Sequence, residues 1–99
     1  MELTFNINQK QYDILLGLRH WMACKAKYKE RWPEDYEKER DKIHKTIVFL
    51  FDDADRLGIP YWVQNIVCGF QDDWRHTLET YLYQDLEKYG VNCAGVSCR

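Results

Sequence analysis

The sequence predicts an all-α protein, an antiparallel bundle of three long helices with a short extended N-terminal arm. Apolar side chains recur at helical spacing over most of the 99 residues, and 45% of the residues are hydrophobic against 30% charged, as in globular proteins. The two prolines, Pro33 and Pro60, lie where this spacing is interrupted. Two prolines and five glycines are too few for a turn-rich β-sandwich. The length corresponds to one domain, which we place at residues 1–99.

The first elements are an extended segment and a helix over about residues 8–32. Apolar and polar side chains alternate in residues 3–7, as in a strand, but a lone strand has no obvious partner, so an arm packed on the helices is an equal alternative. Asn6 or Asn8 caps the helix, since each has a glutamine three residues later. The helix ends before Pro33. Its apolar stripe comprises Ile14, Leu18, Trp21, Tyr28 and Trp32, and Leu15, Met22 and Ala26 widen it.

Two further helices follow at about residues 34–57 and 60–89. The second opens with Pro33 and two acidic residues, which suit a first helical turn, and it ends before Gly58. The third keeps one broad apolar face up to Gly90, and the aperiodic residues 90–99 predict an irregular tail. Short joins make sequential helices antiparallel neighbours. The expected core contains Ile14, Leu18, Ile43, Ile47, Leu50, Phe70, Trp74 and Leu78.

The sequence shows neither a signal peptide nor a membrane span, which favours a cytoplasmic protein. The net charge is −2, and the start of the chain lacks the basic and apolar regions of a signal peptide. The longest uncharged run, residues 57–71, is too short and too polar to cross a membrane. We therefore expect the four cysteines, at positions 24, 68, 93 and 98, to be thiols.

The aromatic content indicates a surface for a protein partner. Phe, Trp and Tyr make up 15% of the chain, which is more than three helices can bury completely. Residues 62, 63, 66, 67 and 70 are all apolar, so the start of the third helix has more apolar side chains than one face can direct into a groove. Such a surplus favours an isologous homodimer or another partner. The predicted protein-binding residues are Ile59, Tyr61, Trp62 and Ile66, with Trp32 in a separate patch.

A basic helix face supports an alternative partner. Basic residues cluster in the first predicted helix beside Trp21 and Tyr28, and nucleic-acid interfaces combine cations with stacking aromatics. The net negative charge of the whole chain disfavours this alternative. The residues of this candidate nucleic-acid interface are Arg19, Lys25, Lys27, Lys29 and Arg31.

Metal-ligating residues are present, but their spacing does not predict a site. His20 and Cys24 are four residues apart on a helix and reach the same side, and Cys93 and Cys98 lie in the tail. The tight C-x2-C knuckle of structural zinc sites is missing. We therefore expect no bound zinc and no other cofactor.

Two carboxylate pairs suggest one enzymatic alternative. Glu34 and Glu37 form an E-x-x-E pair, and Asp52 and Asp55 form a D-x-x-D pair. These pairs resemble those of MazG-like all-α nucleotide pyrophosphohydrolases, and the resemblance implies a Mg²⁺-dependent nucleotide hydrolase. It covers four residues, and both pairs fall on one expected helix instead of two.

A second polar cluster, Asp72, Asp73 and His76, contains an acid–base pair without a nucleophile beside it. With no catalytic motif, we expect a non-enzymatic protein-binding module. The expected role is that of a small regulator or inhibitor, similar in size to the inhibitors of host defence that phages and mobile elements encode.

Overall fold

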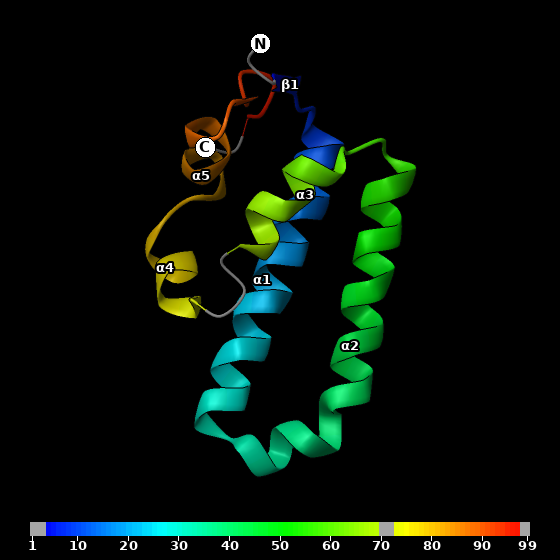
Figure 1. The fold of residues 1–99 in the computed structure, drawn as a ribbon, viewed down its shortest axis with the longest axis vertical. Helices are drawn as coiled ribbons and strands as arrows, with labels where there is room; N and C mark the ends of the chain where they lie inside the picture. Colours follow the sequence, from blue (N-terminus) through cyan, green and yellow to red (C-terminus); the bar gives the residue numbers. More distant parts are fainter. Residues whose placement is uncertain (1–3, 70–72, 98–99) are drawn as a thin grey trace.

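A long helical hairpin forms the body of the protein. The computed structural model describes residues 4–69 and 73–97, and in it α1 (Gln9–Arg31) and α2 (Pro33–Arg56) run antiparallel on either side of Trp32 (Figure 1). The Asn8 side chain accepts a hydrogen bond from Gln11 N, and the Gln11 side chain accepts one from Asn8 N, which closes a capping box. Pro33 begins α2, and Glu34 and Asp35 follow in its first turn. These two helices agree with the predicted ones.

The third predicted helix, 60–89, is wrong as a single element. The structure has α3 (Tyr61–Cys68), α4 (Trp74–Glu79) and α5 (Leu82–Lys88) instead. Asp73 starts α4, because its carboxylate accepts a hydrogen bond from His76 N at 3.1 Å. Thr80 and Tyr81 have extended backbones and separate α4 from α5. The breaks place α3 and α4 against α1 and α5 against α3 and β2, so the protein is all-α but not a bundle of three long helices (Figure 1).

The two ends of the described chain form a small parallel sheet. Strand β1 (Phe5–Asn6) pairs with β2 (Val91–Asn92), with Phe5 opposite Val91 and Asn6 opposite Asn92. Ile7 N donates a further hydrogen bond to Asn92 O at 3.1 Å. The predicted arm is therefore a strand, and its partner is the segment that we expected to be irregular. Val91, Cys93 and Val96 are buried, which anchors this segment in the core.

Helix α1 lies at the centre of the fold, in contact with α2, α3 and α4. Of the expected core residues, Leu18, Ile47 and Trp74 are buried, and Ile14, Ile43 and Leu50 are partly buried against the core. Leu78 is exposed, contrary to the prediction, and lines the rim of a pocket instead of the core. Phe70 lies outside the described residues.

The buried face of α1 agrees with part of the predicted stripe. Leu15, Leu18 and Met22 are buried as expected, whereas Trp21 and Trp32 are exposed and Tyr12, outside the stripe, is buried. The packing of α3 and α4 along α1 accounts for this shift. Among the described helices, none is both long enough and apolar enough to cross a membrane.

Candidate functional site

A buried ion pair joins α1 to α5. Arg19 Nη1 lies 2.9 Å from Asp85 Oδ2, and the two side chains are only 5% and 8% exposed. Burial lowers the pKa of the Arg19 guanidinium and the neighbouring Asp85 carboxylate opposes that shift, so the arginine stays charged. Arg19 is therefore enclosed in the fold, apart from the exposed residues of the candidate nucleic-acid interface.

Further hydrogen bonds connect this ion pair to α4. Arg19 Nη2 donates to the Thr80 hydroxyl at 2.7 Å and to the Thr80 carbonyl at 3.3 Å. The same hydroxyl donates to the carbonyl of His76 at 2.8 Å, and the His76 ring nitrogen Nε2 lies 3.1 Å from Asp85 Oδ1. These contacts hold the extended residues between α4 and α5 against α1. We call Arg19, His76, Thr80 and Asp85 the Arg19 network.

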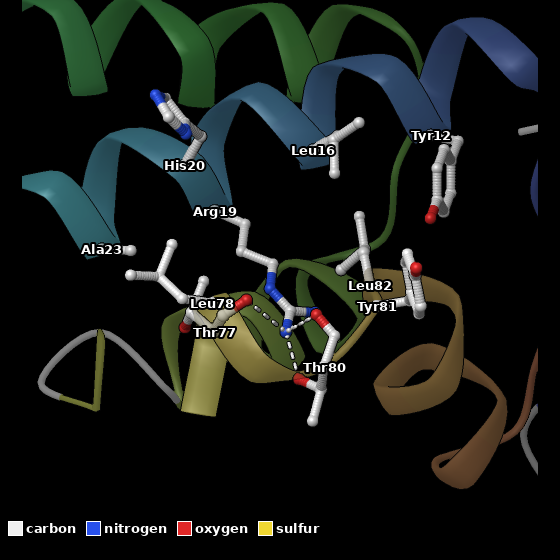
Figure 2. A pocket seen from close by; sticks show the side chains of 10 residues that line it. All are labelled: Tyr12, Leu16, Arg19, His20, Ala23, Thr77, Leu78, Thr80, Tyr81 and Leu82. Atoms are coloured by element: carbon white, nitrogen blue, oxygen red, sulfur yellow. Dashed lines mark hydrogen bonds between the residues drawn. The ribbon is translucent and has the colours of Figure 1, made fainter. Parts of the chain in front are cut away.

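A pocket of about 320 Å³ lies above this network, between α1 and the segment that contains α4 and the start of α5. Figure 2 shows Arg19 crossing the pocket from α1 towards Thr77 and Thr80. Three of the lining residues are apolar or aromatic yet exposed: Leu16 is 44% exposed, Leu78 59% and Tyr81 65%. We call this site the α1–α4 pocket; its lining residues are Tyr12, Leu16, Arg19, His20, Ala23, Thr77, Leu78, Thr80, Tyr81 and Leu82.

The predicted protein-binding residues do not form one surface. Ile59 and Ile66 are buried in the core and Trp62 is partly buried against it. Tyr61, 76% exposed, and Trp32 lie near opposite ends of α2. The apolar surplus that we expected a partner to cover is thus largely covered by the protein itself. Tyr61 and Trp32 remain exposed at separate places, and the Trp32 ring packs edge-on against Tyr28.

Two residues of the predicted basic face, Lys27 and Arg31, gather around one tryptophan. The side chains of Lys27 and Arg31 lie 5.5 and 5.3 Å from the centre of the Trp74 ring, and Arg75 lies 4.4 Å from it. The Trp74 indole N–H donates to Glu30, which also accepts a bond from Arg75 at 3.4 Å. We call Lys27, Arg31 and Arg75 the basic cluster. Lys25 lies on the other side, in a groove between α1 and α2, and Lys29 lies over the Tyr36 ring.

The carboxylate pairs of the enzymatic alternative are far apart. Both lie on α2, with Glu34 and Glu37 at its start and Asp52 and Asp55 near its end. Glu34 and Asp52 are separated by about 27 Å at 1.5 Å per residue, so the two pairs do not share one ion. Asp73 caps α4, His76 belongs to the Arg19 network, and Asp72 lies outside the described residues.

The sulfur and nitrogen ligands do not form a closed site either. His20 Nε2 and Cys24 Sγ lie 3.5 Å apart on the exposed side of α1, whereas Cys93, which follows β2, is buried. Cys98 lies outside the described residues. Within residues 4–69 and 73–97, no three His, Cys, Asp or Glu side chains are grouped closely enough to hold a metal ion.

One residue of the pocket carries a sign in the sequence that it is buried. Arg19 follows Leu15 by four residues and precedes Met22 by three, so a charge inside an apolar stripe was the available sign that it is buried. Asp85, Tyr81 and Arg75 were missed, because their positions depend on the breaks on either side of α4.

Comparison with known proteins gives no further guide to the site: no family model matches the chain, and no significant match is found among curated proteins or solved structures.

Proposed function

We propose that the protein is a non-enzymatic protein-binding module that regulates or inhibits a larger protein through the α1–α4 pocket. The observation that carries this proposal is the exposure of Leu16, Leu78 and Tyr81 around one pocket that the hydrogen-bonded Arg19 and Thr80 also line. The chain, at 99 residues, is similar in size to the inhibitors that phages and mobile elements encode against host defence, and we include this anti-defence role in the proposal. The free thiols of Cys24 and Cys68 fit a cytoplasmic location.

Energetics support the pocket as the contact site. Exposed apolar side chains around a depression are the usual centres of protein interfaces, and a partner's aromatic or aliphatic side chain gains most where it fills a preformed pocket. The Arg19 network keeps the α4–α5 segment fixed, so little ordering entropy is lost on binding. A volume of about 320 Å³ accommodates one large side chain.

Affinity capture from a lysate of the source cells, treated with nuclease, tests this proposal. We expect the wild-type protein to retain a specific protein that the Leu78→Ala and Tyr81→Ala variants do not retain. Each substitution should weaken the binding free energy by about 2 kcal/mol, which lowers the affinity about 30-fold. Phe49→Ala is the matched control, because Phe49 is a similarly exposed apolar residue, 66% exposed, on α2. Retention of the same protein by both pocket variants would contradict the proposal.

Nucleic-acid binding is the second candidate, and the basic cluster favours it. Lys27 and Arg31 from α1 converge with Arg75 from α4 on the Trp74 ring, which concentrates positive charge from two elements. If this cluster contacts phosphates, a plot of the logarithm of the association constant against the logarithm of the salt concentration has a negative slope of about 0.7 to 0.9 per contact. The Arg75→Gln variant should make that slope less steep. Lys45→Gln, on exposed α2, is the control. No binding of DNA or RNA at about 50 mM salt removes this candidate.

A further inference from the structure

A histidine and a cysteine lie side by side on the exposed surface of α1. His20 and Cys24 are one helical turn apart, and Nε2 of the imidazole is 3.5 Å from Sγ of the thiol. Both residues are exposed and lie in the middle of a 23-residue helix, so the backbone that carries them is regular. Figure 2 shows the His20 ring directed away from the Arg19 guanidinium. The Arg19 network therefore leaves this pair accessible.

The spacing of the two atoms matches the edge of a tetrahedral zinc site. Zinc binds a thiolate at about 2.3 Å and an imidazole nitrogen at about 2.05 Å, and a tetrahedral angle then places the two ligand atoms about 3.6 Å apart. The observed 3.5 Å agrees with that value. Both side chains thus reach one ion without a change in the helix, and thiolate and imidazole are ligands that zinc favours.

Two of the four positions around such an ion remain open. Within the described part of the chain, no third His, Cys, Asp or Glu side chain joins the pair. We propose that His20 and Cys24 form half of a zinc site, which a second copy of the chain completes with its own His20 and Cys24. The resulting His₂Cys₂ set is a standard structural zinc environment.

The surroundings of the pair are compatible with a second copy. Leu16 lies one turn before His20 and Trp21 lies beside it, and both are exposed apolar residues that a twofold contact would cover. The isologous symmetry supplies two identical ligand pairs at one axis. We expected no bound zinc from the sequence because the ligands of a single chain do not complete a site. A second copy supplies the two ligands that one chain lacks.

Zinc titration of the purified, reduced, metal-free protein tests the proposal. We expect the mass measured by light scattering to double, with saturation at about one zinc ion per two chains. Cobalt(II) should give the intense visible bands of a tetrahedral site and a thiolate charge-transfer band. Both responses should be lost in His20→Asn and in Cys24→Ser, whereas His44→Asn, which alters an exposed histidine on α2, retains them.

The variants separate this site from other thiols. Circular dichroism of the metal-free variants checks that they fold, which we expect because both side chains are exposed. A mass that stays monomeric with zinc overturns the proposal, and so does a cobalt spectrum that survives Cys24→Ser. Loss of the response in Cys98→Ser also overturns it, because the ligands would then include the tail. The experiment uses no protein partner, so its outcome is independent of the proposed function.

Discussion

Arg19 and Asp85 form an ion pair at 2.9 Å in the interior of the protein, and this pair fixes α5 to α1. Both charges were removed from water on folding, which costs several kcal/mol for each ion. The cost is offset by their mutual attraction and by the bonds that Thr80 and His76 contribute. Arg19 and Thr80 also line the α1–α4 pocket, so the same contacts that stabilise the fold position residues of the proposed binding site.

Removal of either partner should therefore destabilise the protein strongly. We expect Arg19→Ala and Asp85→Ala each to lower the free energy of unfolding by about 3–5 kcal/mol, since each leaves a buried charge without its counterion. Urea denaturation followed by circular dichroism measures this change. The matched control is Glu37→Ala, which breaks the exposed Glu37–Arg40 pair on α2. That substitution should cost less than about 0.5 kcal/mol, and equal losses in both pairs would contradict the prediction.

The contact between Trp74 and Glu30 predicts a pH effect. The hydrogen bond from the Trp74 indole, aided by the charge of Arg75, lowers the pKa of the Glu30 carboxyl from its ordinary value of 4.5. A folded-state pKa below the unfolded one stabilises the fold above pH 4.5, and this stabilisation disappears as the pH falls through the lowered pKa.

Substitution of the donor tests that effect. Trp74→Phe removes the indole N–H, so the pKa of Glu30 should rise towards 4.5, as measured by NMR titration of its carboxyl carbon. Arg75→Gln, which removes the secondary cause, should produce a smaller rise. An unchanged Glu30 pKa in Trp74→Phe would show that the indole does not hold the carboxylate.

Local signals explain which elements the sequence predicted correctly. The Asn8–Gln11 capping box, Pro33 in a first turn and Gly58 after a last turn act within a few residues of each helix end. The third predicted helix failed because its apolar residues keep helical spacing through both breaks. Asp73 begins α4 and Thr80 follows its end. The packing of α4 on α1 also fixes these ends, and such a contact between distant segments cannot be recognised from a short stretch of sequence.

Non-local contacts explain what the sequence did not reveal about the surface. Strand β1 finds its partner at the other end of the chain, and Asp85 reaches Arg19 only after α4 and α5 have folded back. Ile59 and Ile66 were expected in an interface, but the protein's own packing buries them. Apolar composition alone therefore does not distinguish an interior from a binding surface.

Two apolar residues with opposite exposure test the observed core. Ile47 on α2 is buried, and Ile47→Ala should lower the free energy of unfolding by about 2–5 kcal/mol. Leu78→Ala should cost less than about 0.5 kcal/mol, because most of this side chain is already in contact with water. Urea denaturation of the two variants decides between this arrangement and the predicted stripe, in which both residues were internal. Similar losses for both would favour the stripe.

Gly58 ends α2 in a backbone conformation that side chains disfavour. Its φ angle is +75°. Gly58 N donates a hydrogen bond to Asp55 O at 3.0 Å, and Ile59 N donates one to Ala54 O at 3.1 Å. This turn directs Ile59 into the core. A Cβ atom at position 58 would meet no heavy atom within 4 Å, so the cost of a substitution is conformational and not steric.

We therefore expect Gly58→Ala to lower the free energy of unfolding by about 1–2 kcal/mol, the penalty of the left-handed conformation. Gly58→Asn should lose less, because asparagine tolerates this conformation better than alanine does. Gly69 supplies the control: its φ of −61° is helical, so Gly69→Ala should be neutral or stabilising by a few tenths of a kcal/mol. Thermal and urea unfolding of the three variants measure the differences. If Gly58→Ala is as stable as the wild type, α2 ends in a different turn, and Ile59 enters the core by another route.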